Sequence, residues 1–408
     1  MSTRTTPPSS RAATSHLDAA WHRELLDELC EIPRETASES ERRAAEWVAR
    51  RLEDEGAPAR LEEEPSNGGY WWPLGLAGGA GLLAGLAARR GHRRLATLIG
   101  ALAAAAAVDD LPPRSRRFRR LLPSRPAANV LAEVGPADAS HTVVVAAHHD
   151  TAHSGWIFSP AIPSAVDRYA PWALESADTS PPLMLPVVGA PAVVAAGALT
   201  GRSGLLRAGV ALCAGVVASM TDIGRRPAVP GANDNGTGVV AMIALARALA
   251  ERPPDRLRVL FLSTSEEATC EGMHHFAARH FAELPRERTF FLCLDTVGSP
   301  HLCVLRGEGM LGMREYPGES LGLVDGLAAD LDIELFPNLR LRNATDGIYP
   351  LAAGYQCAAV CSCTRLKQPA NYHWPTDVPD NVDFETVGDA IRLTEAVVRR
   401  LDERWLDG

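Results

Sequence analysis

A chain of 408 residues is long enough to bury a full hydrophobic core, and its length alone permits two or three domains. Its formal net charge of −9 excludes a general nucleic-acid partner, because phosphate binding requires a basic surface. No secretory signal is recognisable, and the eight cysteines are scattered, so we expect free buried thiols and a cytoplasmic location. Cys357, Cys361 and Cys363 form one cluster, but without a second pair or a nearby histidine a metal site there is not expected.

The N-terminal region predicts a leader followed by two helices. Residues 1–15 are rich in Ser, Thr, Pro and Arg, and we expect them to be disordered. Apolar residues then recur at helical spacing between Leu17 and Glu55. Pro33 ends the first helix, and Gly56 is a plausible cap for the second.

Apolar strands alternate with helices over much of the remaining chain. Strands are predicted at 128–134, 142–147, 258–263, 290–294 and 358–362, and helices at 239–250 and 384–401. The unbroken apolar runs are typical of strands that are covered on both faces of a sheet. The alternation therefore indicates an α/β fold with a mainly parallel sheet.

Two apolar stretches interrupt this alternation. Residues 68–88 carry no charge, and a basic turn then precedes an Ala-rich run from 95 to 108. Residues 179–201 are likewise uncharged, and Arg202 and Arg207 precede a second uncharged run at 208–221. Each insert thus predicts a helical hairpin with a basic turn. Only the first member of each pair reaches the roughly 20 apolar residues that a membrane span needs.

The distribution of arginines does not determine how the first insert would be oriented in a membrane. One basic cluster lies in its turn and a second follows at 114–120, so a spanning hairpin would place them on opposite faces. Cytoplasmic loops normally hold the arginines. Hairpins that lie in one leaflet, or a soluble helical cap buried against itself, avoid this conflict. We expect membrane contact of some kind through residues 68–108 and 179–221.

Five short motifs contain every ligand that a two-zinc hydrolase site needs. His148 and Asp150 follow a predicted strand, and their spacing of two projects both side chains to one side while His149 points away. His148 can then bind metal, and Asp150 can orient its ring. The other motifs lie at strand ends or in loops between elements. The motif ranges are 147–151, 231–238, 265–267, 294–296 and 372–377.

Carboxylates dominate the remaining motifs. Asp234 lies in a glycine-rich turn before a helix, and each of its oxygens can serve one of two cations. Glu266 and Glu267 are adjacent after a buried strand, where they resist desolvation unless cations offset them. If Glu267 binds metal, Glu266 is left to act as general base and later as acid. Asp295 and His373 complete the set. Each motif alone has an ordinary structural explanation, so their combination indicates the shared site.

The motif set resembles that of the zinc-dependent aminopeptidase family, which includes bacterial leucyl aminopeptidases, glutamate carboxypeptidase and the glutaminyl cyclases. The resemblance covers residues 17–408 apart from the two inserts. It implies a three-layer α/β/α sandwich around a mixed, mainly parallel sheet, and it places a single catalytic domain over residues 16–408. The two apolar helical hairpins interrupt that domain at about 68–122 and 157–228.

The resemblance also implies two zinc ions per chain. His148, Asp234 and Asp295 match the ligands of one zinc, and Asp234, Glu267 and His373 match those of the other. The second insert separates the His148 motif from Asp234 by more residues than in relatives. Both inserts therefore flank the site, where we expect a lid or membrane platform that limits which substrates enter.

Hydrolysis of a peptide or small amide bond is the expected activity, with release of an N-terminal residue. In the resemblance, Asp150 orients a zinc ligand and Glu266 is the general acid and base. We add Tyr372 as a candidate substrate contact. Two alternatives stay open, namely a one-zinc transferase that cyclises N-terminal glutamine, and an inactive binding protein on the same fold. Residues 235–238 look more like the peptidase branch.

Overall fold

A seven-stranded sheet forms the centre of the fold in this computed structural model, which describes residues 15–172, 177–265 and 269–405. The strands lie in the order β1-β2-β4-β3-β5-β10-β6. Strands β4, β3, β5 and β10 pair in parallel, whereas β2 and β6 run antiparallel to their neighbours. The predicted mixed sheet of an α/β fold is therefore confirmed. The bounds are β1 (Ala59–Ser66), β2 (Arg125–Val134), β3 (His141–His148), β4 (Leu257–Thr264), β5 (Thr289–Asp295), β6 (His301–Val304) and β10 (Gln356–Cys363).

Helices cover both faces of the sheet, because successive residues of each buried strand point to opposite sides. In β3, Val143 and Val145 pack on one face, and Val144 and Ala146 pack on the other. These alternating layers give the three-layer α/β/α sandwich that the sequence predicts. The first face is covered by α1 (Ala19–Cys30), α2 (Glu39–Asp54), α9 (Thr237–Glu251), α11 (Gly318–Asp330) and α13 (Phe384–Arg404). The second is covered by α10 (Glu271–His280) and α12 (Ile348–Ala353).

Strand β1 is an element that the sequence pattern does not predict. Its residues 59–66 include three consecutive glutamates and a proline, which obscure any apolar alternation. It lies at the edge of the sheet, where charged residues and proline are tolerated, and it pairs with β2 from Ala59 opposite Ala132. Of the predicted leader, residues 1–14 lie outside the described residues, and Ser15 begins a short 3-10 helix.

The cysteines are free thiols, as the sequence predicts. All except Cys30 are buried. Cys357, Cys361 and Cys363 lie on β10, where they belong to the apolar core between the sheet and helices α10 and α12.

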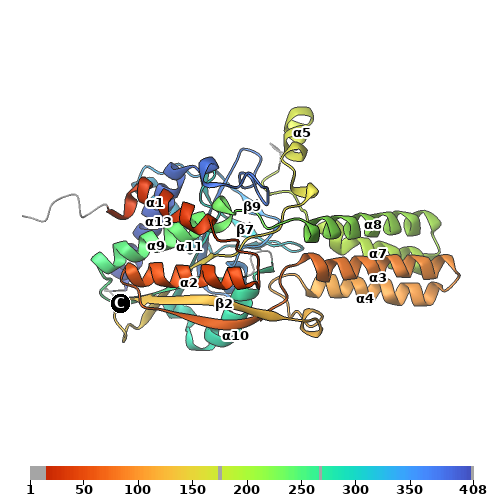
Figure 1. Ribbon diagram of the computed structural model, residues 1–408, viewed down its shortest axis with the longest axis horizontal. Helices are drawn as coiled ribbons and strands as arrows, with labels where there is room; N and C mark the ends of the chain where they lie inside the picture. The colour runs from red at the N-terminus through yellow and green to blue at the C-terminus, as the bar shows by residue number, and fades with distance from the viewer. Residues whose placement is uncertain (1–14, 173–176, 266–268, 406–408) are drawn as a thin grey trace, which may run out of the picture.

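Four helices form an arm that projects from one end of the α/β body (Figure 1). Helices α3 (Trp71–Arg89) and α4 (Arg93–Asp109) form the first hairpin, and α7 (Leu185–Thr200) and α8 (Ser203–Arg225) form the second. Helix α3 packs against α7 and α8, and α4 packs against α7. The two predicted apolar hairpins are present and together make one bundle.

In the second hairpin, α8 is longer than α7, whereas the sequence predicts that the first helix is the longer one. Helix α7 begins only at Leu185, because the prolines at 181 and 182 delay helix formation. Helix α8 instead continues through Arg207 and Asp222 to a length of 23 residues. Two helices, α3 and α8, are thus long and apolar enough to cross a membrane, whereas α7 is shorter.

A buried ion pair joins the base of the arm to the α/β body. Arg119 is 1% exposed and donates to both carboxylate oxygens of Asp110, at 2.7 and 2.9 Å. Asp110 caps the C-terminus of α4, and Glu271, the first residue of α10, lies 3.5 Å from the same guanidinium. Arg116 is also buried and donates to Thr269 at 3.2 Å. Two arginines of the predicted cluster at 114–120 are therefore internal groups.

Asp110→Ala is expected to lower the free energy of unfolding by about 3 kcal/mol, since it removes one partner of a buried charge pair. Glu63→Ala is the control, because Glu63 and Arg42 form an exposed pair worth about 1 kcal/mol or less. Thermal unfolding of the two purified variants and the parent protein measures the difference. Equal shifts for both variants would contradict a structural role for the buried pair.

Candidate metal centre

Neighbouring parallel strands bring the predicted site residues together at their carboxyl ends. His148 is the last residue of β3 and Asp295 is the last residue of β5, and these two strands are paired. Asp234 lies in the turn just before α9, and His373 lies in the loop between β10 and α13. Loops at this edge of an α/β sheet commonly carry function.

The Asp234 carboxylate lies between the two histidine rings. Its Oδ1 is 3.3 Å from His148 Nε2, and its Oδ2 is 3.3 Å from His373 Nε2. Asp234, His148 and His373 are at most 5% exposed. Ligand atoms of His148, Asp234 and Asp295 all lie within 4.8 Å of one another. One carboxylate thus faces a different imidazole with each of its oxygens.

These residues fit zinc. Ligand atoms about 2 Å from a tetrahedral zinc ion are about 3.3 Å apart, which is the separation found on both sides of Asp234. His148 Nε2 and Asp234 Oδ2 are buried and make no hydrogen bond within residues 15–172, 177–265 and 269–405. Buried polar atoms without a partner are costly, and a shared cation between ligand atoms removes that cost. Imidazole nitrogen and carboxylate oxygen are also the donors that zinc takes in hydrolytic sites.

Electrostatics at the site favour positive charge. Burial lowers the pKa of His148, but the nearby carboxylates of Asp150, Asp234 and Asp295 outweigh burial and raise this pKa well above its ordinary value. Burial also raises the pKa of Asp234, yet His148 and His373 hold it below the ordinary range. The buried carboxylates therefore stay charged and attract cations.

Asp150 holds the His148 ring from the side opposite Asp234. Its Oδ1 lies 3.5 Å and its backbone oxygen 3.3 Å from His148 Nδ1, and the Thr36 hydroxyl donates to its Oδ2. Because Nδ1 faces Asp150, Nε2 is the nitrogen that faces the proposed metal position. His149 turns away, as the spacing predicts, and its Nε2 lies 2.7 Å from Glu41 on α2.

Asp377 and Arg34 position the Asp234 turn, and neither role is predicted from the sequence. The Asp377 carboxylate accepts the backbone N–H groups of Asn233 at 2.7 Å and Asp234 at 3.1 Å. Burial raises the pKa of Asp377 to about 7, and these N–H groups favour its charged form. Arg34 donates to the backbone oxygens of Pro230 and Gly231 at 2.9 and 2.7 Å.

Asp377 could have been identified from the sequence more easily than Arg34. Asp377 lies in the same motif as His373, which is a usable hint. Arg34 follows the first helix and has no signal of its own. Gly231 completes the turn with a φ of +65°, and a β-carbon at this position would lie 2.2 Å from Thr151 Cγ2, so there is no room for a side chain.

Asn235 joins the Asp234 turn to the end of β5. Its side-chain oxygen accepts the N–H of Gly238 at 3.1 Å and that of Thr296 at 2.9 Å. Its amide nitrogen donates to Leu294 at 2.8 Å. The positions of Asp234 and Asp295 are therefore fixed relative to each other by one side chain between them.

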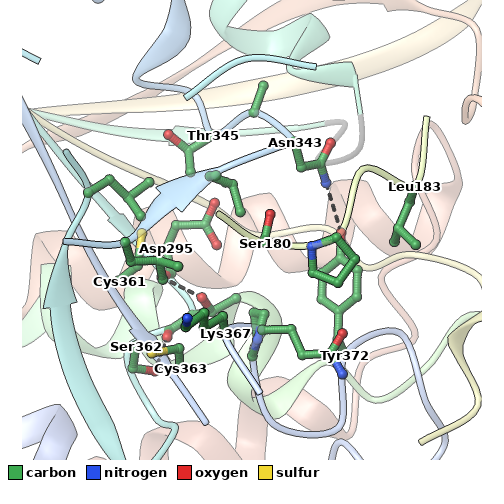
Figure 2. A pocket seen from close by; sticks show the side chains of 18 residues that line it. Ser180, Leu183, Asp295, Asn343, Thr345, Cys361, Ser362, Cys363, Lys367 and Tyr372 are labelled. Atoms are coloured by element: carbon green, nitrogen blue, oxygen red, sulfur yellow. Dashed lines mark hydrogen bonds between the residues drawn. The ribbon is translucent and has the colours of Figure 1, made fainter. Parts of the chain in front are cut away.

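Tyr372 lies beside the metal centre and lines a pocket with Asp295 (Figure 2). Its ring stacks on His373 with 3.9 Å between centroids, and its hydroxyl accepts from the Asn343 amide at 3.0 Å. The same pocket has apolar walls that include Leu305 and Leu339. A substrate group held there would contact Tyr372 and lie next to a candidate zinc ligand.

A second pocket separates the metal centre from the arm. It is lined by His373 and Tyr372 together with Leu74 of α3, Val187 of α7 and Met220 of α8. Phe158 also lines this pocket and contacts the His373 ring edge-on, with 4.5 Å between ring centroids. The base of the arm is therefore part of the wall of the site.

Glu266 and Glu267 lie outside the described residues. Strand β4, which precedes them, ends at Thr264 beside the end of β3, where His148 pairs with Thr264. The assignments of Glu266 as general base and Glu267 as zinc ligand stay predictions.

The family model of peptidase family M28 matches residues 218–398, a range that includes Asp234, Asp295 and His373. No curated protein sequence matches the chain significantly. The chain is similar to a leucine aminopeptidase precursor from Bacteroides thetaiotaomicron, with 13% identity, coverage of 94% of this chain and 97% of that one, and a TM-score of 0.55. It is also similar to a zinc aminopeptidase from Bacillus subtilis, with 14% identity, coverage of 94% and 95%, and a TM-score of 0.55.

A glutaminyl cyclase from Bacteroides thetaiotaomicron is similar to the same degree, with 13% identity, coverage of 94% and 98%, and a TM-score of 0.56. At these identities the likeness concerns the fold. The family match and the fold together confirm the resemblance that the motifs predict. Residues 218–398 therefore match peptidase family M28, and the chain has the fold of the zinc aminopeptidases and glutaminyl cyclases to which it is similar.

Proposed function

We propose that the protein is a two-zinc aminopeptidase in which Asp234 bridges the two ions. The observation that carries this proposal is the placement of Asp234, with one carboxylate oxygen 3.3 Å from each of two buried histidines. A single-ion site has no need for two imidazoles on opposite oxygens of one carboxylate. His148, Asp234 and Asp295 would hold one ion, and Asp234, His373 and Glu267 would hold the other.

Bound zinc supplies a Lewis acid that activates water for attack and polarises the scissile carbonyl. Asp150 keeps the His148 ring in the orientation and tautomer that leave Nε2 available. Glu266 takes the proton of the attacking water and returns it to the nitrogen of the leaving peptide, so that the proton balance closes. The Tyr372 hydroxyl donates to the oxygen of the carbonyl under attack.

The substrate side chain is proposed to occupy the pocket next to Asp295 (Figure 2). Leu305, Leu339 and Leu341 give it apolar walls, and Tyr372 closes it on the metal side. An apolar side chain such as that of leucine enters such a pocket at little cost in hydration free energy, whereas a charged side chain must give up its hydration. We therefore expect preference for apolar N-terminal residues.

Metal content and a substrate panel test the assignment. The purified protein is expected to bind two zinc ions per chain and to hydrolyse leucine anilide faster than lysine or glutamate anilide, because three leucines form the apolar walls of the pocket. Chelation should abolish activity, and added zinc should restore it. One zinc per chain, with ammonia release from a glutaminyl peptide, would instead support the cyclase alternative. Full activity after chelation would contradict any zinc mechanism.

Two substitutions separate metal binding from proton transfer. Glu266→Gln is expected to lower kcat by about 100-fold or more and to leave zinc content unchanged, because only the proton acceptor is lost. His373→Ala should abolish activity and also lower the zinc content, because it removes a ligand. Metal analysis and kinetics of both variants make the comparison. Full activity of Glu266→Gln would remove the base assignment.

Asp377→Ala is expected to weaken zinc binding by about 10- to 100-fold, because its carboxylate fixes the backbone on which Asp234 is carried. Asp380→Ala is the matched control, since its side chain is exposed and pairs with Arg23 away from the metal centre. Zinc titration with a competing chelator measures both affinities. Equal affinities for the two variants would show that the Asp234 turn holds its shape without Asp377.

A further inference from the structure

The arm buries mainly small residues in α3 and α4, buries larger apolar residues such as Val194 and Met220 in α7 and α8, and exposes most of its leucines. In α3 the buried face includes Ala77, Gly78, Gly81 and Ala84, and in α4 the buried residues are Ala96, Gly100, Ala103 and Ala107. Leucines occupy the outer surface of all four helices. Those that are at least half exposed are Leu76 at 51%, Leu83 at 63%, Leu95 at 50%, Leu98 at 56%, Leu102 at 61%, Leu185 at 55% and Leu199 at 70%. A bundle in water instead has charged and polar residues on its outer surface.

Close helix contacts depend on the glycines of the buried face. A β-carbon on Gly81 would lie 2.5 Å from Cys213 Sγ, and one on Gly85 would lie 2.3 Å from Val210. A β-carbon on Gly209 would lie 2.6 Å from the backbone nitrogen of Val194. The helix backbones thus approach closely at small residues, as they do in helix bundles within membranes. In a membrane, leucines on the outer surface contact lipid hydrocarbon, which is as apolar as they are.

The dimensions of the arm match a bilayer. At 1.5 Å per residue, the 19 residues of α3 span about 28 Å and the 23 residues of α8 about 35 Å, against a hydrocarbon core of about 30 Å. Only 44% of the apolar window of α3 and 28% of that of α8 is buried. Neither helix is therefore the enclosed core helix of a water-soluble domain.

Three hydroxyl groups of the arm are satisfied within their own helices. The hydroxyls of Thr97, Thr200 and Ser219 each donate to the carbonyl four residues earlier in their own helix, at 2.7 to 3.0 Å. Lipid offers no hydrogen-bond partners, so this arrangement suits hydrocarbon. Thr97 and Thr200 lie near the tip, and Ser219 lies toward the base.

Charges and aromatic rings mark the two ends of the apolar band. At the tip, exposed arginines occupy both hairpin turns, and Arg93 donates to the carbonyls of Ala198 and Leu199, at 2.9 and 3.0 Å, which ties the hairpins together. At the base, Trp71 and Trp72 begin α3, and Trp156, which is 48% exposed, bonds through its backbone N–H to Asp222 of α8. Arginine and tryptophan are typical of the two polar interfaces of a bilayer.

We propose that the four-helix arm spans a lipid bilayer, with the α/β body on one side and the arginine tips on the other. The occupant of the leucine surface is lipid hydrocarbon, and the tip arginines face phosphate headgroups. The buried Arg116 and Arg119 remove part of the conflict that the sequence presents, since they pair inside the protein and face no membrane loop.

Extraction of membranes from cells that produce the full chain tests the proposal. Most of the protein is expected to stay in the membrane pellet after alkaline carbonate and high salt, and detergent should release it. The double variant Leu83→Lys/Leu98→Lys places two charges on the outer surface of the arm. Its amount in the membrane pellet should therefore fall, either because the protein becomes soluble or because it is degraded. Leu311→Lys, on the α/β body, is the control and should leave the distribution unchanged. Release of the parent protein by carbonate would overturn the proposal.

Thiol labelling then separates spanning from insertion into one leaflet. Arg90→Cys places a thiol at the tip, and Asp138→Cys places one on an exposed turn of the α/β body. The parent protein is the blank, because all of its cysteines except Cys30 are buried. Spheroplasts and inverted vesicles expose opposite sides of the membrane. A membrane-impermeant maleimide should therefore label only one of the two variants in spheroplasts and only the other one in inverted vesicles. Labelling of both from the same side would contradict a span. Each variant counts only if it elutes as a single peak in detergent.

Discussion

The buried Asp234 carboxylate, between His148 and His373, is the constraint on which the site depends. A charged group at this depth is tolerated only with compensating charge. Asp150 and Asp295 add further negative charge around His148. Protonated imidazoles supply some compensation, but both rings then lose their capacity to act as ligands. A cation between ring and carboxylate compensates the charge and uses the lone pairs at the same time, so bound zinc accounts for the arrangement.

The fold holds this arrangement by backbone contacts that converge on one turn. Asp377 binds the N–H groups before and at Asp234, Arg34 binds the carbonyls that precede them, and Asn235 joins the turn to the end of β5. The base of the arm forms the opposite wall, where Leu74 and Val187 share a pocket with His373. If the arm lies in a bilayer as proposed, the candidate metal centre lies close to the membrane surface.

Much of the fold is predictable because it follows from local patterns. Apolar runs locate the central strands, and strand ends locate His148 and Asp295. The edge strand β1 is missed, because its consecutive glutamates are tolerated at the edge of a sheet but do not alternate with apolar residues. The role of Arg34 is missed because it depends on a partner 197 positions away. The packing of two hairpins into one arm is likewise a long-range property. The composition of each helix is visible in the sequence, whereas the inward placement of the small residues appears only when the helices are assembled.

Anomalous diffraction from zinc-loaded crystals, recorded on both sides of the zinc absorption edge, tests the bridging role of Asp234 most directly. Two anomalous peaks are expected per chain, one between His148 and Asp234 and the other between Asp234 and His373. One peak away from Asp234, or no peak at full zinc loading, would contradict the account.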